Sequence, residues 1–467
     1  MKKTFFQQYI VPVALLMAAG MAGSCKKLIQ IPPNPPTEIV QSQQFADSST
    51  AMTAVALVYS YVGLQTSSGF GYNDATLPES TGLSSDELIY TSTNIPDMTA
   101  FTGYGLTNLN SVVAQLWSDQ YASLYPINAI IEGVSGSTGL SAGFKKQITA
   151  EMQVVRALYY FNLVNLFGGV PLSLSTDYKA TGILPRASVD SVYGQILADL
   201  TSAKQNLSAG YPSSGHIRPN QLVASALLSR VYLYRQQWQQ AYDAANTVIG
   251  SGSYSLTSDP NTTFLNGSTE AIWQLPATSG YYVTAEGYYF SPNYGAAPNY
   301  PVNTWLLKAF EPGDIRMKDW LGQMVVNGNT LYYPHKYKNI QASSPTTEDY
   351  MILRLAEQYL IRAEASAELG NGAAALADVN IVRARAGLPA STANPAVQAA
   401  VLNAIMHERQ VELFTEWGHR WYDLKRTGQA GTVLAAEKTG WTADAALYPI
   451  PLLQLQNDVN LKQNPGY

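Results

Sequence analysis

Apolar residues recur every three to four positions along most of this chain, which is the spacing of amphipathic helices. Two pairs of these stretches are joined by short polar turns, at 235–237 and 370–372, and are rich in small residues, so their helices can pack closely as antiparallel hairpins. Such hairpins stack in tetratricopeptide-like repeats. We therefore predict a mainly α-helical fold with a tetratricopeptide-like hairpin scaffold. The predicted helices cover residues 48–64, 109–132, 144–167, 188–207, 221–234, 238–249, 357–369 and 373–386.

Two long stretches, near 65–108 and 251–347, interrupt the helical pattern. The first is rich in Gly, Ser, Thr and Asn, and the second contains two segments, 270–276 and 330–337, that read as short strands. Irregular stretches of this length usually carry function, and the aromatic residues of the first argue against disorder. We expect a single domain over 38–467 in which these two insertions bind the ligand.

Residues 405–428 carry a ladder of like charges. Read as one helix, this stretch places Glu408, Glu412 and Glu416 at four-residue spacing, and carboxylates in that arrangement repel one another unless cations dock on them. Arg409 falls among the apolar positions, so we expect it to be a buried partner of the ladder. These groups could serve acid–base catalysis, but we interpret them as an ion-pair network that fixes helix packing. The other expected partners are Arg354, Arg362, Arg383, Arg385 and Arg420.

The N-terminus has the features of a bacterial lipoprotein signal. Two lysines precede an apolar run at 10–21 that is too short to span a bilayer comfortably, and small residues lead into Cys25. Cys25 is the only cysteine, so it forms no internal disulfide. We predict that residues 1–24 are a signal peptide, that Cys25 is lipidated and holds the protein at the membrane, and that the proline-rich residues 25–37 form an extended tether.

Composition points to a neutral polar ligand. Only 13% of the residues are charged, against 46% hydrophobic, and 31 tyrosines outnumber 12 phenylalanines. Tyrosine rings can stack on a ligand and also hydrogen-bond it. The net charge of −5 gives no basic footprint, so we expect no nucleic acid partner. The candidate ligand-binding residues, all in the two insertions, are Phe70, Tyr72, Asn73, Asp74, Tyr90, Tyr281, Tyr282, Tyr288, Tyr289 and Tyr294.

The sequence lacks the common catalytic motifs. His407 and Glu408 begin an HExxH pattern, but its last position is Val411, and the four histidines are widely scattered. Neither a GxSxG nucleophile elbow nor a phosphate-binding loop is present. Two adjacent acid pairs, at 86–87 and 348–349, could suggest a glycosidase, but we interpret them as solvated residues of polar loops. We therefore predict no catalytic residue, no metal and no cofactor.

Four ordered segments resemble the SusD/RagB family. They read RALYYFNLVNLFGGVPL (156–172), RLAEQYLIRAEASAELGNGAAALADVNIVRARAGLP (354–389), ERQVELFTEWGHRWYDLKRTG (408–428) and LYPIPLLQLQNDVNLKQNPGY (447–467). One departure is Trp417, because the family more often has Glu-Gly directly before the His/Arg-Trp unit. The resemblance implies a SusD-like helical fold and an outer-membrane lipoprotein that captures nutrients, mostly glycans, for a TonB-dependent, SusC-like transporter.

The leading hypothesis is an oligosaccharide-binding lipoprotein that is anchored by lipid in the outer membrane, is exposed at the cell surface and performs no bond chemistry. Its aromatic residues would grip the apolar faces of sugar rings, and neighbouring Asn, Asp and Tyr groups would select the hydroxyl geometry. Three alternatives stay open at this point. They are a surface glycosidase, a repeat scaffold that binds only proteins, and a carrier of peptides rather than glycans.

Overall fold

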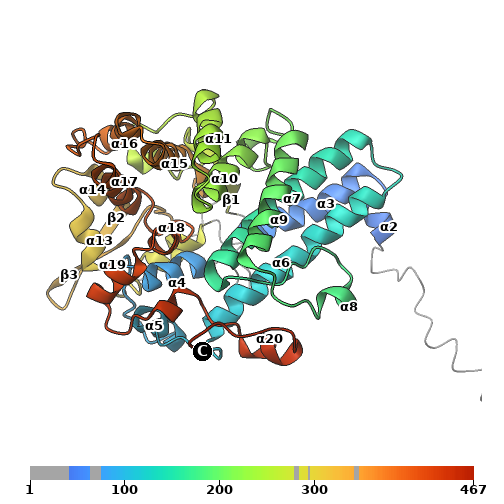
Figure 1. Cartoon of the computed structure of the whole chain (residues 1–467), viewed down its shortest axis with the longest axis horizontal. Helices are drawn as coiled ribbons and strands as arrows, with labels where there is room; N and C mark the ends of the chain where they lie inside the picture. The colour runs from blue at the N-terminus through green and yellow to red at the C-terminus, as the bar shows by residue number, and fades with distance from the viewer. Residues whose placement is uncertain (1–40, 64–74, 278–282, 293–294, 341–346) are drawn as a thin grey trace, which may run out of the picture.

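Long helices packed in chain order form the body of the protein (Figure 1). The structure, a computed structural model, describes residues 41–63, 75–277, 283–292, 295–340 and 347–467. The long helices are α3 (Ser48–Gly63), α6 (Ser111–Gly136), α7 (Ala142–Phe167), α9 (Val189–Asn206), α10 (Gln221–Tyr234), α11 (Trp238–Gly250), α15 (Leu355–Glu368), α16 (Gly372–Arg385) and α17 (Gln398–Glu412). From α6 to α17, each of these helices packs against the next. This arrangement is typical of helical repeats and confirms the predicted mainly α-helical hairpin scaffold.

Shorter helices occupy the connections. They are α2 (Gln41–Gln44), α4 (Leu77–Ser84), α5 (Pro96–Gly103), α8 (Tyr178–Thr181), α12 (Ala285–Phe290), α13 (Thr304–Ala309), α14 (Ile315–Trp320), α18 (His419–Arg426), α19 (Ala430–Glu437), α20 (Leu452–Asn457) and the 3-10 turns η2 (Ser214–His216), η3 (Pro260–Thr262) and η4 (Ala443–Ala446). α4 and α5 lie in the first insertion, whose composition predicts an irregular loop. Both have a proline in the first turn, which fixes a helical φ angle, and α4 is buried along its whole length.

Four short strands form two separate antiparallel pairs. β1 (Ala271–Pro276) pairs with β4 (Asp349–Arg354), and β2 (Leu321–Val326) forms a hairpin with β3 (Asn329–Pro334). The hairpin turn at 327–328 is Asn-Gly with positive φ angles of 50° and 80°, as a type I′ turn requires. Both predicted strand segments are present, and β4 leads directly into α15.

Side-chain caps set where several helices begin. Asn110, Ser141, Ser188 and Asn220 each accept a hydrogen bond from a backbone N–H in the first turn of α6, α7, α9 and α10 respectively. Such caps satisfy backbone groups that have no partner inside the helix. The helix predicted from residue 144 therefore begins two residues earlier, directly after its cap.

The prediction of one continuous helix over 405–428 is wrong. α17 ends at Glu412, and α18 begins at His419, after a bend formed by the six residues between them. In the bend, Thr415, Trp417 and Gly418 have positive φ angles of 54°, 48° and 74°. A right-handed helix cannot continue through such residues. The two halves of this stretch therefore present their charges to different neighbours.

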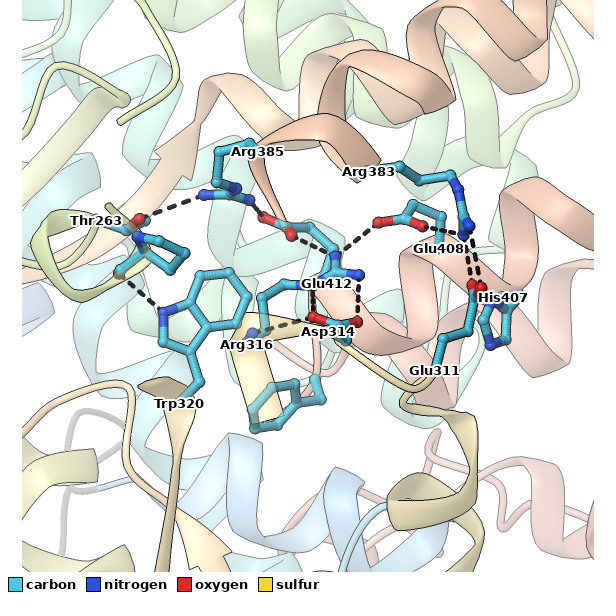
Figure 2. Close-up of polar contacts among 12 residues, drawn as sticks. Thr263, Glu311, Asp314, Arg316, Trp320, Arg383, Arg385, His407, Glu408 and Glu412 are labelled. Carbon is cyan, nitrogen blue, oxygen red and sulfur yellow. Dashed lines mark hydrogen bonds and ion pairs between the residues drawn. The ribbon is translucent and has the colours of Figure 1, made fainter. Parts of the chain in front are cut away.

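Glu412 is the centre of a buried ion network, and Figure 2 shows it between Arg316 and Arg385. Its carboxylate accepts hydrogen bonds from Arg316 Nη1 at 2.8 Å, from Arg354 Nη1 at 2.5 Å and from Arg385 Nη2. These cations come from α14, β4 and α16. Burial alone would raise the pKa of Glu412, but the three guanidinium groups hold that pKa well below its ordinary value. Glu412 therefore stays ionised and joins three distant elements to α17.

The other carboxylates of the ladder share the same cations. Glu408 accepts a hydrogen bond from Arg316 Nη1 at 2.6 Å. Glu416 accepts one from Arg354 Nε at 2.7 Å and one from the Lys336 ammonium group at 2.5 Å. All five of these side chains are at most 8% exposed. The expectation that cations from other segments dock on the ladder is confirmed, although Arg316 and Lys336 were not among the predicted partners.

Arg409 is buried as expected, but it does not bind the ladder. Its guanidinium Nε donates to Asp423 Oδ2 in α18 at 2.7 Å. In one straight helix these two residues would lie about 21 Å apart, so the bend before α18 makes the pair possible. Arg362 and Arg420 also pair with carboxylates outside the ladder. The predicted partners that do approach the ladder are Arg354, Arg383 and Arg385.

The adjacent acid pairs are buried, so the prediction that they are solvated is wrong. Asp86 accepts two hydrogen bonds from Arg420, at 2.7 and 2.6 Å, across 334 positions of the sequence. Burial, together with the neighbouring Asp86 carboxylate, raises the pKa of Glu87 to about 8. In the second pair, at 348–349, burial raises the pKa of Asp349 to about 6. The polar residues around each pair in the sequence do not predict this burial, because segments distant in the sequence cover both pairs.

The network can be tested by removing its central charge. Glu412→Gln keeps the side-chain shape but leaves three guanidinium groups without their shared carboxylate, so the free energy of unfolding should fall by about 3–5 kcal/mol. The matched control is Asp190→Asn, because Asp190 pairs with Arg235 at 2.7 Å but is 82% exposed. Exposed pairs contribute less than about 1 kcal/mol. Urea unfolding of both variants measures the difference, and equal losses would contradict a stabilising network.

Glu87 gives a prediction about pH. An acid whose pKa is raised by folding favours the protonated form in the folded state, so it destabilises the protein increasingly as pH rises from its ordinary pKa of 4.5 to about 8. Glu87→Gln removes this titration. The melting temperature of the variant should therefore rise relative to that of the wild type over this range. Parallel melting profiles for the two proteins would show that Glu87 has an ordinary pKa.

Candidate functional site

The two insertions meet in the structure. Residues 86–91 run alongside residues 298–303, and Leu88 forms an antiparallel bridge with Val302. Backbone hydrogen bonds of 2.7 to 3.0 Å continue the pairing on both sides of this bridge. Segments about two hundred positions apart in the chain are therefore held together by main-chain contacts, which do not depend on side-chain identity. This junction carries the predicted ligand residues that the structure describes.

α12 presents two tyrosines at this junction. The Thr284 hydroxyl caps the helix by accepting a hydrogen bond from Gly287 N at 3.2 Å, where the sequence predicts no regular structure. Tyr288 is 38% exposed and Tyr289 is partly exposed. Their ring centroids lie 5.1 Å apart at an interplanar angle of 87°. Phe290 is buried, so it anchors the end of the helix while the two tyrosine rings reach the surface.

Tyr90 is connected to α12 through a third aromatic residue. The ring of Tyr90 packs against that of Tyr300 at 5.2 Å, and Tyr300 in turn packs against Phe290 at 5.8 Å. The Tyr90 hydroxyl accepts a hydrogen bond from Ile95 N at 3.0 Å. Tyr90 is half-buried, so much of its surface packs within the junction. Tyr300 was not among the predicted residues, although the tyrosine-rich stretch at 281–300 contains it.

Most of the candidate residues lie outside the described parts of the chain. The structure therefore places three of the ten predicted ligand residues, and Tyr90 is linked to the helix of the other two through Tyr300 and Phe290. The predicted lipidation site, Cys25, is outside the described residues too. The ligand candidates outside them are Phe70, Tyr72, Asn73, Asp74, Tyr281, Tyr282 and Tyr294.

The inner side of α12 faces the ion network. Glu286 and Phe290 of this helix line a small internal cavity of about 10 Å³ together with Lys336 and Glu416. A space of this size holds at most one water molecule. The Lys336 ammonium group also donates to the backbone carbonyl of Phe414 at 2.9 Å. The exposed tyrosines therefore rest on a densely packed, charge-paired base, which is suited to holding a binding surface rigid.

A larger cavity, of about 700 Å³, lies between α10, α11, α15, α17, α18 and α19. Its lining includes Arg426, which pairs with Glu364 at 2.5 Å, and Arg420, which binds Asp86. These charges already have partners, and no candidate ligand residue that the structure describes lines the space. The tyrosine pair on α12 is therefore the better candidate for a neutral polar ligand, although it is the shallower feature.

Two further findings concern only the parts of the chain that the structure describes. No helix there combines the length and the apolar character needed to cross a membrane. No group of three or more His, Cys, Asp or Glu side chains there is placed to hold a metal ion.

Two protein-family models match the chain. Residues 318–467 match a model described as the SusD family, and residues 43–233 match one described as starch-binding associating with outer membrane. The first range contains the ladder and the C-terminal segments that carry the resemblance. The second contains the helices from α3 to α10.

Similar proteins agree with these matches. SusD-like protein P38 of Formosa agariphila is 24% identical over the full length of both chains, and SusD-like protein P25 of the same organism is 26% identical over 76% of this chain and 80% of its own. A laminarin-binding SusD-like protein of known structure is 26% identical, with a TM-score of 0.76 over 90% of this chain and 100% of its own. A SusD superfamily structure from Bacteroides vulgatus, 20% identical over 90% of this chain and 99% of its own, has a TM-score of 0.80 and supports the same fold. The chain belongs to the SusD/RagB family.

Proposed function

We propose that this protein is a glycan-binding lipoprotein of the outer membrane, which captures an oligosaccharide and delivers it to a TonB-dependent, SusC-like transporter. The observation that carries the proposal is the pair of tyrosine rings on α12, one exposed and one partly exposed, near the junction of the two insertions. One matched family model is described as starch-binding and associated with the outer membrane. A relative of known structure is described as laminarin-binding.

Stacking on a sugar is the role that suits these rings. A sugar ring covers only part of one aromatic face, so at roughly 25 cal/mol per Å² each tyrosine contributes on the order of 1–2 kcal/mol. Several such contacts, with hydrogen bonds to hydroxyl groups, reach the roughly 4–8 kcal/mol of millimolar to micromolar binding. Weak binding of this kind allows release. Release is what a protein that hands its ligand to a transporter requires.

The proposed protein performs no bond chemistry. A glycosidase would need two carboxyl groups in contact with the substrate, one of them with a raised pKa. Glu87 has a raised pKa, but its side chain is 2% exposed, so a substrate does not reach it. Turnover of an oligosaccharide by the purified protein would overturn this part of the proposal. Binding of peptides alone would change the class of cargo.

The proposed organisation places the binding body at the end of a lipid tether. Residues 1–24 act as the signal peptide, Cys25 carries the lipid, residues 25–37 are the tether, and residues 38–467 form one domain at the cell surface. Stable anchoring needs more than one acyl chain, because each buried methylene contributes only about 0.8 kcal/mol. A bacterial lipoprotein carries several such chains on its first residue.

The tyrosine pair can be tested by calorimetry. Replacing Tyr288 and Tyr289 together by Ala should weaken oligosaccharide binding at least tenfold, or about 1.4 kcal/mol, and should leave the melting temperature nearly unchanged because these side chains reach the surface. Oligosaccharides of starch and laminarin are the probes. Tyr178→Ala, at a 73% exposed tyrosine in α8, is the control and should bind as the wild type does.

Two outcomes would contradict this assignment. Unchanged affinity with a normal melting temperature would remove α12 from the site and leave Phe70, Tyr72 and Tyr90 as candidates. A large fall in melting temperature would mean that Tyr288 and Tyr289 are structural residues. In either case the ligand, once found, could be used to test the remaining candidates one at a time.

The anchor can be tested by metabolic labelling with a clickable fatty acid. The wild-type protein should incorporate the label and fractionate with the outer membrane. Cys25→Ala should lose the label, because the thiol is the acylation site, and should become soluble or stay unprocessed. Equal labelling of the two proteins would refute lipidation at Cys25.

A further inference from the structure

Six large apolar side chains lie exposed on three neighbouring segments. Each is between 60% and 90% exposed, whereas most residues of this kind are buried in this protein. The segments are the start and middle of α6, the connection through α8, and the C-terminal segment around α20. The six residues, which we call the apolar face, are Leu109, Tyr125, Tyr178, Ile183, Leu453 and Val459.

Hydrogen bonds hold these three segments side by side. Leu452 N donates to Asn108 O at 2.8 Å, which places the start of α20 next to the start of α6. Asn460 Nδ2 donates to Ile183 O at 2.8 Å, which joins the end of the C-terminal segment to the α8 connection. Tyr121 of α6 donates through its hydroxyl to Pro171 O at 2.8 Å. Figure 1 shows α8 and α20 along one edge of the molecule, beside α6.

The C-terminal part of this face presents little charge. Between Leu453 and Leu461, Asp458 is the one charged residue. Asp458 is 8% exposed, and its carboxylate accepts a hydrogen bond from Asn460 N at 2.9 Å. Scattered exposed apolar residues are ordinary in soluble proteins, but a group of them marks a contact surface. The surface therefore suits an apolar partner better than a charged one.

We propose that the apolar face rests on the lipid surface of the membrane that holds the anchor. The inference rests on the proposed lipidation of Cys25. Two of its residues are tyrosines, whose amphipathic rings favour the boundary between lipid and water, and the other four are Leu, Ile and Val, which can enter the acyl region. This contact fixes the orientation of the domain relative to the membrane, which a tether alone would not do.

The reach of the anchor agrees with this placement. The first described residues lie next to the C-terminal end of α6, where Ser137 donates through its hydroxyl to Phe45 O at 2.6 Å. At 1.5 Å per residue, Tyr125 lies about 18 Å from that end of α6 and Leu109 about 40 Å from it. Residues 26–40 can span at most about 50 Å. The two residues of the apolar face on or next to α6 therefore lie within reach of a lipid at Cys25.

Tethering also makes a weak contact sufficient. A group linked to the membrane meets the lipid surface at a high effective concentration, so the second contact forms without the cost of a new encounter. Each Leu or Val side chain that moves from water into lipid contributes enough free energy to change the partition coefficient between water and membrane roughly tenfold or more. A few such side chains can therefore hold the orientation and still exchange rapidly.

Vesicle sedimentation tests the contact separately from the anchor. The full mature chain with Cys25→Ala has no lipid, so any sedimentation with vesicles of phosphatidylethanolamine and phosphatidylglycerol reports the body alone. We expect weak partitioning, too weak to hold the untethered chain at the cell membrane, that persists at high salt because the contact is apolar. Adding Leu453→Glu and Val459→Glu should lower the partition coefficient by roughly a hundredfold. The melting temperature should stay unchanged, since both side chains are exposed.

The matched control is Val325→Glu in the same background. Val325 is 69% exposed on β2, away from the apolar face, so this variant should partition as its parent does. Equal partitioning of the parent and the double variant, or none by either, would overturn the proposal. Loss of transporter co-purification or of self-association in the double variant, with vesicle binding unchanged, would assign the face to a protein partner instead. Fatty-acid labelling tests lipidation at Cys25 independently of these results.

Discussion

The charge on Glu412 is the constraint on which the rest of this structure depends. A carboxylate with no exposed surface is strongly disfavoured unless cations compensate for the lost hydration. Here Arg316, Arg354 and Arg385 supply that compensation, and each belongs to a different element. The network therefore works only when α14, β4 and α16 are all in place against α17. Compensation of the Glu412 charge therefore requires the second insertion and the hairpin scaffold to be in place at the same time.

The same constraint supports the surface that we propose as the binding site. α12 is only six residues long, and a helix of that length is not stable by itself in water. Its Phe290 packs against Tyr300, and its inner side faces Lys336 and Glu416 of the network. The helix that carries the two tyrosine rings is thus held in place by the surrounding structure. Preorganisation of this kind reduces the ordering cost of binding.

The sequence predicts the parts of this fold that local patterns determine. Helical periodicity locates the hairpins, and the four-residue spacing of the glutamates predicts their need for cations. The sequence does not predict features that depend on contacts between distant segments or on backbone conformation. The bend at Thr415, Trp417 and Gly418 has no periodic signal, and the burial of Asp86 depends on Arg420 far along the chain. At the candidate site, tyrosine enrichment points to α12, but the packing of Tyr90 on Tyr300 appears only in three dimensions.

In the proposed complex, a neutral oligosaccharide binds at the aromatic junction of the two insertions, supported by the charge network beneath it. A crystal structure of the protein with a bound oligosaccharide tests this most directly. We expect a sugar ring stacked on Tyr288 or Tyr289, with its hydroxyl groups facing residues of the two insertions. A sugar bound instead in the cavity of about 700 Å³ between α10 and α17, with α12 unoccupied, would contradict it.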